Sequence, residues 1–118
     1  MSAYNDNNVF AKILRGEIPC QKVYEDDHVL AFNDIAPQAP VHILVIPKGE
    51  YRDFSAFAAQ APAALVQGFF AAISTIAAQQ QLEHYRLITN NGAGAGQSVF
   101  HFHVHLLAGK KMSALLPE

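Results

Sequence analysis

Three histidines at alternate positions near the end of the chain have the residue type and spacing best suited to chemistry. His101, His103 and His105 are separated by Phe102 and Val104. In a β-strand, side chains at every second position share one face, so the three imidazoles are predicted to point the same way. Such a row provides a nucleophile, a neighbour that fixes its tautomer and a group that handles protons. The spacing therefore favours nucleophilic catalysis.

A glycine-rich loop before these histidines indicates the kind of electrophile. Gly92, Gly94 and Gly96 allow backbone N–H groups to approach an anion closely, and Gln97 and Ser98 add side-chain donors. Donors beside an imidazole suit phosphoryl or nucleotidyl transfer. The loop lacks Gly-Lys-Ser/Thr and precedes a predicted strand, so it is not a P-loop. A plain hairpin turn is the alternative interpretation of the glycines.

A zinc site is the competing interpretation of the histidines, since histidine is a common zinc ligand. Positions i and i+4 of a strand lie about 13 Å apart, which prevents all three imidazoles from reaching one ion. The segment also contains no cysteine or acidic cluster. A site of two of these histidines with His42 stays open, but we expect neither a metal nor another cofactor.

The hydrophobic pattern predicts the elements that position these residues. Residues 9–15 are expected to form a short helix and residues 61–80 a long one, with Pro62 in its first turn. Five strands are predicted, at residues 21–25, 28–33, 41–46, 85–89 and 98–107. In the last strand, we expect the alternate positions Phe100, Phe102, Val104 and Leu106 to face the core. The prediction is a single α+β domain over residues 1–118, an antiparallel five-stranded meander covered by two helices.

The stretch of residues 54–82 contains no charged residue and is long enough to span a bilayer. However, Gln60, Gln67, Ser74 and Gln81 recur every seven positions and form a polar stripe. This pattern predicts an amphipathic helix lying on a core and argues against a membrane span. The uncharged outer face is one that a partner subunit could cover.

The composition agrees with a globular protein. The 118 residues carry a formal net charge of −2, and 51% of them are hydrophobic. The slightly acidic balance argues against sequence-independent binding of nucleic acids, which requires a basic face. Cys20 is the single cysteine and no secretory signal pattern begins the sequence, so a reducing, cytoplasmic location is expected.

Two blocks of the sequence resemble a known family. Residues 101–107 fit the His-φ-His-φ-His-φ-φ motif of the histidine triad superfamily, where φ is an apolar residue. Residues 32–48 and 96–101 resemble its nucleotide-binding protein branch, and the likeness extends over residues 9–111. The resemblance implies a homodimer that is paired through the long helix and an adjoining strand.

The resemblance implies a purine nucleoside phosphoramidase. Such an enzyme cleaves a P–N bond and releases a nucleoside monophosphate through a nucleotidyl-histidine intermediate. A dinucleoside polyphosphate hydrolase is the nearest alternative. A non-catalytic nucleotide-binding or zinc-binding module is the alternative of another class.

The same resemblance implies a role for each site residue. His103 would be the nucleophile, His101 would orient it through a backbone carbonyl, His42 would support it, and His105 would contact the phosphate or the leaving group. The other expected contacts, grouped by the part of the nucleotide, are Asn90, Gly96, Gln97 and Ser98 for the phosphate, Asp34 for the ribose hydroxyls, and Val9, Phe10, Ile13, Phe32 and Ile35 for the purine.

Overall fold

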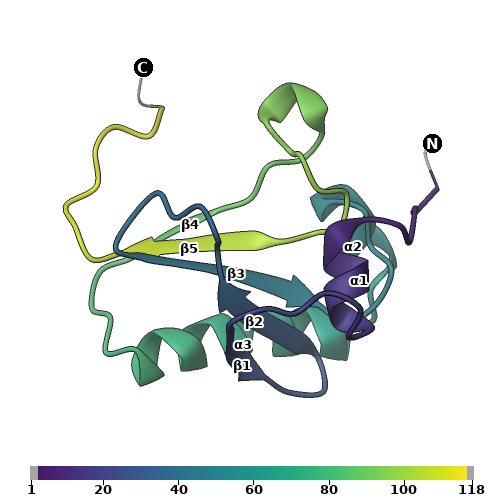
Figure 1. Ribbon diagram of the computed structural model, residues 1–118, viewed down its shortest axis with the longest axis horizontal. Coiled ribbons are helices and arrows are strands. Elements are labelled where there is room, and N and C mark those ends of the chain that lie inside the picture. Colours follow the sequence, from purple (N-terminus) through teal and green to yellow (C-terminus); the bar gives the residue numbers. More distant parts are fainter. Residues whose placement is uncertain (1–2, 117–118) are drawn as a thin grey trace.

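The computed structural model describes residues 3–116, which form one five-stranded antiparallel sheet with helices on both faces (Figure 1). The strands are β1 (Lys22–Glu25), β2 (Val29–Asn33), β3 (Val41–Pro47), β4 (Arg86–Ile88) and β5 (Val104–Ala108). The predicted α+β class and five-stranded antiparallel sheet are confirmed. The order β1-β2-β3-β5-β4 differs from a simple meander because β5 lies between β3 and β4. This order puts β5, which carries His105, in the interior of the sheet.

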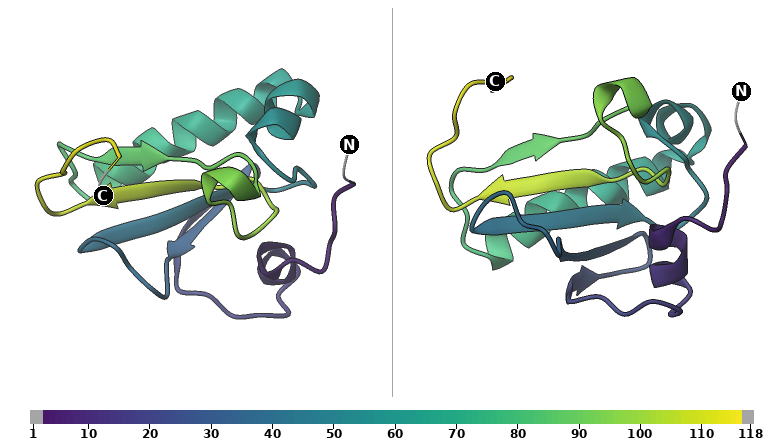
Figure 2. Two further views of the ribbon diagram at one scale, coloured as in Figure 1. Left: turned by 90° about the horizontal axis from the view of Figure 1, so that it is seen from above. Right: turned by 45° about the horizontal axis from the view of Figure 1, so that its top comes forward.

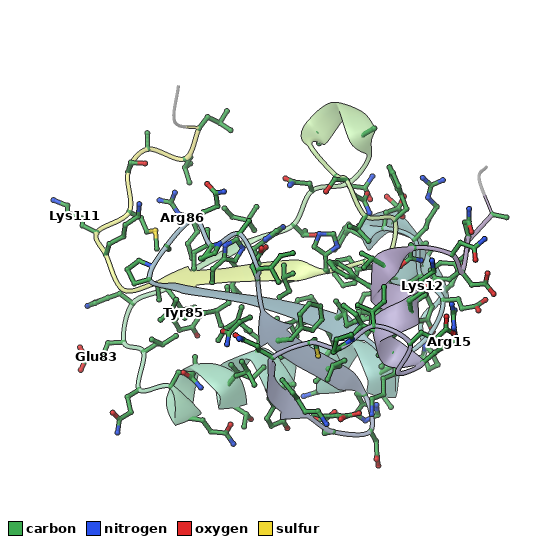
Figure 3. All side chains as sticks on the ribbon, viewed as in Figure 1. Lys12, Arg15, Glu83, Tyr85, Arg86 and Lys111 are labelled. Carbon is green, nitrogen blue, oxygen red and sulfur yellow. The ribbon has the colours of Figure 1, made fainter. Side chains whose placement is uncertain are left out.

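The helices are divided between the two faces of the sheet. Helices α2 (Phe54–Gln60) and α3 (Ala63–Gln79) cover one face, and α1 (Val9–Leu14) lies on the other (Figure 2). Asn8 caps α1 through its Oδ1, which accepts the Ala11 N–H at 2.9 Å. Lys12 and Arg15 extend from the outer side of this segment (Figure 3). No helix within residues 3–116 is long and apolar enough to cross a membrane.

The long helix predicted over residues 61–80 is confirmed as α3, which begins two residues later than expected, but the sequence did not predict the additional helix α2 before it. Asp53 begins α2 by accepting the Ala56 N–H at 2.8 Å. Pro62 is the N-cap of α3 instead of a residue in its first turn. Proline cannot donate a backbone hydrogen bond, so the chain turns between the two helices.

The last strand begins at Val104, six residues later than predicted. The Phe102 N–H donates to the Tyr51 carbonyl at 2.7 Å, so this part of the chain does not join the sheet ladder. Phe102 is buried as expected, but Phe100 is only half-buried and lies under the Arg52 guanidinium, 4.8 Å from its carbon to the ring centroid. The first two histidines of the motif therefore lie in an irregular segment before the strand.

Two apolar clusters fix this segment from both faces of the sheet. Between the sheet and α3, the rings of Phe57 and Phe102 stack with their centroids 4.6 Å apart, and Phe69 packs against both. On the α1 face a second cluster consists of Phe10, Leu30, Phe32, Leu44 and Ile46. Because Phe102 is anchored in the first cluster, the histidines on either side of it are held in place.

Candidate active site

A cavity of about 420 Å³ opens on the α1 face of the sheet, between α1, the ends of β2 and β3, and the segments on either side of the glycine loop. Eleven of the fourteen residues expected at the site line it, namely Val9, Phe10, Ile13, Phe32, Asp34, Ile35, Asn90, Gly96, Ser98, His103 and His105. The other three, His42, Gln97 and His101, are buried outside its lining. The cavity thus brings together residues from widely separated parts of the chain.

The ring of His103 is fixed in one tautomer. Its Nδ1 lies 2.7 Å from the His101 carbonyl oxygen, and because a carbonyl only accepts, Nδ1 carries the proton. Burial lowers the pKa of His103, which favours the neutral ring. Nε2 of the neutral ring is then unprotonated, so its lone pair is available to a ligand in the cavity that His103 lines. Phe10 packs edge-on against this ring, with the two centroids 4.9 Å apart.

His101 is completely buried and lies behind the cavity. Its Nε2 donates to the Pro47 carbonyl at 2.9 Å, and its Nδ1 accepts the Tyr4 hydroxyl at 2.6 Å. Burial lowers the pKa of His101 to about 4, so the ring is neutral. The prediction that all three imidazoles point the same way is therefore wrong for His101, which does not line the cavity. Its side chain supports the site from inside the protein.

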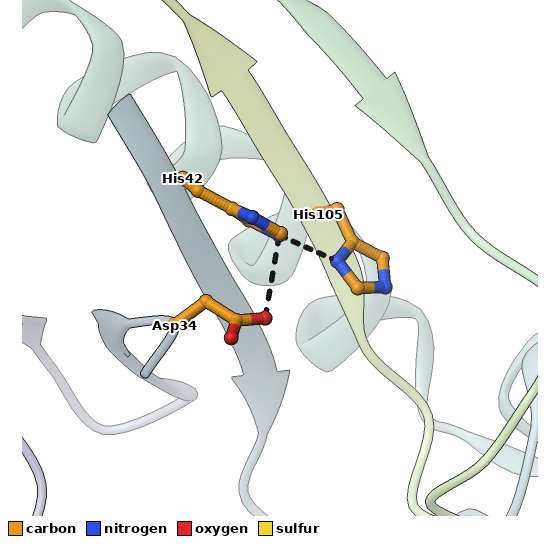
Figure 4. Close-up of side chains that lie close together, drawn as sticks. All are labelled: Asp34, His42 and His105. Carbon is orange, nitrogen blue, oxygen red and sulfur yellow. Dashed lines mark hydrogen bonds and ion pairs between the residues drawn. The ribbon is translucent and has the colours of Figure 1, made fainter. Parts of the chain in front are cut away.

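His42 and His105 form a hydrogen-bonded pair beside Asp34 (Figure 4). The Gln38 N–H donates to His42 Nδ1 at 3.0 Å, so the proton of neutral His42 resides on Nε2. This Nε2 lies 2.9 Å from His105 Nδ1 and 3.4 Å from Asp34 Oδ2. His105 accepts at Nδ1, and its own proton is consequently on Nε2.

The cavity therefore presents two complementary groups on neighbouring residues. His103 offers a lone pair and His105 offers an N–H donor, and their ring centroids are 5.1 Å apart. Burial, reinforced by the nearby His103 and His42, lowers the pKa of His105 to about 4. A nucleophile and a hydrogen-bond donor for an anion thus coexist at neutral pH without a charged imidazole.

A metal ion does not fit this arrangement well. Asp34, His42 and His105 each offer a ligand atom, and these atoms lie within 4.8 Å of one another. Ligation by His42 Nε2 would move the ring proton to Nδ1, where it would face the Gln38 N–H. Two donors would then point at each other inside the protein, which is costly. The hydrogen bonds favour the metal-free pair.

Gln97 was predicted to bind the phosphate, and the structure contradicts this prediction. Its Oε1 accepts the Gly92 N–H at 2.8 Å, and its Nε2 donates to the carbonyls of Arg52 at 2.7 Å and Val99 at 3.0 Å. The side chain is buried and does not line the cavity. Gln97 therefore braces the glycine loop and is not free to bind a phosphate.

The structure also contradicts the prediction that backbone N–H groups of the glycine loop bind an anion. Residues Ala93–Ala95 form a short 3₁₀ turn, in which the N–H groups of Ala95, Gly96 and Gln97 donate to carbonyls of the same loop. These groups cannot also form the predicted anion cradle. Of the polar residues predicted to bind the phosphate, Asn90 and Ser98 contribute side chains to the cavity lining.

The apolar end of the cavity agrees with the prediction except at its rim. Phe10, Ile13 and Phe32 line it, whereas Ile35 is 101% exposed and lies at the opening. Sequence reasoning missed several other lining residues, which are Ile18, Pro19, Cys20, Gln21, Asn33, Leu44 and Val99. It also missed Tyr4 and Thr89, whose hydroxyls bond to His101 and to the His103 carbonyl. Tyr4 is 97 positions from its partner, a contact that no local pattern reveals.

Comparison with known proteins identifies the family. The model of the HIT domain matches residues 15–112. An uncharacterized 13.2 kDa HIT-like protein of Azospirillum brasilense is 50% identical over 98% of this chain and 96% of its own length. A HIT family hydrolase from Clostridium thermocellum has a similar structure, with a TM-score of 0.83 and 38% identity over 95% of this chain and 99% of its own.

A histidine triad nucleotide-binding protein from Candida albicans is also structurally similar, with a TM-score of 0.76 and 27% identity. The alignment covers 94% of this chain and 86% of the Candida protein. The chain therefore belongs to the HIT domain family, and it shares its fold with a hydrolase and a nucleotide-binding protein of that family.

Proposed function

We propose that this protein is a purine nucleoside phosphoramidase, which hydrolyses the P–N bond of nucleoside 5′-phosphoramidates. The observation that carries the proposal is the fixed tautomer of His103, whose Nε2 lone pair is available at the cavity beside the His105 donor. A neutral, oriented imidazole is an effective nucleophile toward phosphorus. The family resemblance and the nucleotide-binding relative agree with a nucleotide substrate.

The proposed reaction has two steps. His103 Nε2 attacks phosphorus, so that an Nε2–P bond forms, the P–N bond breaks and the leaving amine takes up a proton from solvent water. A water molecule then attacks the same phosphorus and gives up a proton to solvent. The Nε2–P bond breaks, the nucleoside monophosphate leaves and His103 is regenerated. We expect the N–H of His105 and the hydroxyl of Ser98, two residues of the cavity lining, to bind phosphate oxygens as charge develops on them.

The two ends of the cavity support a purine nucleotide. Phe10, Ile13 and Phe32 supply apolar walls for a flat base, and a bicyclic purine buries more apolar area there than a pyrimidine. Asp34 also lines the cavity, and its carboxylate can accept hydrogen bonds from ribose hydroxyls.

The test compares P–N with P–O–P cleavage by the purified protein. We expect an adenosine phosphoramidate to be hydrolysed with a higher kcat/KM than a diadenosine polyphosphate. The opposite ranking would identify a dinucleoside polyphosphate hydrolase. Tight nucleotide binding without turnover of either substrate would indicate a binding module. Stoichiometric zinc that survives dialysis would contradict the metal-free arrangement of His42 and His105.

A homodimer is part of the proposal, because apolar side chains are left uncovered beside an edge strand. Leu87 of β4 is 44% exposed and Phe70 of α3 is 45% exposed. Leu87 lies opposite Leu106, so it is on the α3 face of the sheet. In the described part of the chain, β4 has a strand neighbour on one side only, and Tyr85 and Arg86 lie at its start (Figure 3). A second copy would cover both the strand edge and these side chains.

Leu87→Asp is expected to convert the dimer into a monomer, because a buried, unpaired carboxylate would oppose association. Light scattering after size-exclusion chromatography measures the mass. Ala58→Asp is the control, since Ala58 is exposed on α2 and the substitution adds the same carboxylate outside β4 and α3. A wild-type protein that runs as a monomer would contradict the dimer.

A further inference from the structure

The N-terminal segment contacts the triad from two sides, although it precedes the region matched by the HIT domain model. That match begins at residue 15. The Phe10 ring packs against His103 at the cavity, and the Tyr4 hydroxyl bonds to His101 from behind. The proposed nucleophile and its immediate support are thus both in contact with residues outside the matched region.

The Tyr4 hydroxyl completes the hydrogen bonding of a buried ring. His101 is 0% exposed, and its Nε2 proton is committed to the Pro47 carbonyl. The lone pair on Nδ1 therefore has to find a donor inside the protein, and the Tyr4 hydroxyl supplies it at 2.6 Å. Without this hydroxyl, a buried acceptor would be left unpaired, and the ring would gain by turning to find another partner.

The orientation of His101 matters because its peptide group holds the nucleophile. Its carbonyl accepts the His103 Nδ1–H at 2.7 Å, and the N–H of the same peptide, that of Phe102, donates to the Tyr51 carbonyl at 2.7 Å. A change at the His101 ring shifts this peptide, and His103 then loses the acceptor that selects its tautomer. The alternative tautomer would place the proton on Nε2 and remove the nucleophilic lone pair.

We propose that Tyr4 is a positioning residue, which keeps His103 in its nucleophilic tautomer by anchoring His101. Its effect on turnover rests on the proposed function, whereas its effect on the His103 tautomer does not. Tyr4 does not line the cavity, so it is not a binding residue for the nucleotide.

Tyr4→Phe removes only the hydroxyl, and Tyr24→Phe is the matched control. The Tyr24 hydroxyl also donates to a side chain, Asp26, at 2.8 Å, but between β1 and β2 and away from the cavity. For Tyr4→Phe we expect kcat on an adenosine phosphoramidate to fall about tenfold with KM unchanged, because an oriented reactive group is loosened while the cavity is kept. Tyr24→Phe is expected to keep the wild-type kcat.

Nitrogen-15 chemical shifts of the histidine rings provide the readout that is independent of activity. We expect the wild-type His103 to carry its proton on Nδ1, and Tyr4→Phe to populate both tautomers. A folded Tyr4→Phe protein with wild-type kcat and an unchanged His103 tautomer would overturn the proposal. If the wild type has no hydrolase activity, the proposed function fails and the tautomers alone decide the role of Tyr4.

A measurement on the wild type covers the case in which Tyr4→Phe does not fold. The Tyr4 hydroxyl proton is expected to be protected from exchange with water and to correlate with His101 Nδ1 across the hydrogen bond. A rapidly exchanging hydroxyl proton without this correlation would overturn the proposal.

Discussion

His103→Ala is expected to lower kcat on adenosine phosphoramidates by at least about 10⁴-fold, because it removes the only proposed nucleophile. The neighbouring groups that bind the nucleotide remain, so its dissociation constant is expected to change far less than kcat. Stopped assays of product amine and nucleoside monophosphate measure the rate, and calorimetry with the monophosphate measures binding.

The control is His84→Ala, which removes an exposed imidazole outside the cavity lining. It is expected to leave kcat unchanged, so a shared loss would indicate general damage to the fold. A His103→Ala protein that binds the monophosphate and retains more than about a tenth of the wild-type kcat would exclude His103 as the nucleophile.

Acidification is expected to destabilise the protein through His101. The unfolded-state pKa of histidine is near 6.5, and burial lowers that of folded His101 to about 4. Between these values the unfolded chain binds a proton that the folded protein excludes, so the free energy of unfolding falls as the pH decreases. The difference of about 2.5 pKa units corresponds to about 3 kcal/mol, which is fully present above pH 6.5 and is lost on approaching pH 4.

Urea unfolding at a series of pH values between 7 and 4 measures this effect. Burial also lowers the pKa of His42, His103 and His105, so each of them is expected to lower the free energy of unfolding further as the pH decreases. A free energy of unfolding that is constant from pH 7 to pH 5 would contradict the buried, neutral His101.

The elements with strong local signals were predictable from the sequence. The apolar run at residues 41–46 predicted a strand, which is observed as β3, and the short helix expected at residues 9–15 is observed as α1. Helix α2 was missed, because the predicted long helix began at residue 61 and no element was assigned to the uncharged residues 54–60 before Pro62. Composition alone did not reveal this second, shorter helix.

The site was predictable in its residue types and less so in its hydrogen bonds. The alternation of histidines with apolar residues correctly grouped His103 and His105 at the cavity. Strand periodicity does not apply to residues 98–103, however, because the Phe102 N–H bonds to the Tyr51 carbonyl instead of to a neighbouring strand. Gln97 resembled a phosphate contact because its carboxamide is next to Ser98 in sequence. Its actual partners include Arg52, 45 positions away, and only tertiary structure brings them together.

The most direct test of the proposed mechanism is intact-mass spectrometry after a rapid quench with an adenosine phosphoramidate. Wild-type protein and His103→Ala are compared side by side. An adenylyl adduct on the wild type and none on His103→Ala is the predicted result, because the nucleotidyl group is proposed to be carried by His103 Nε2. An adduct that persists in His103→Ala would contradict the assignment of His103 as the nucleophile.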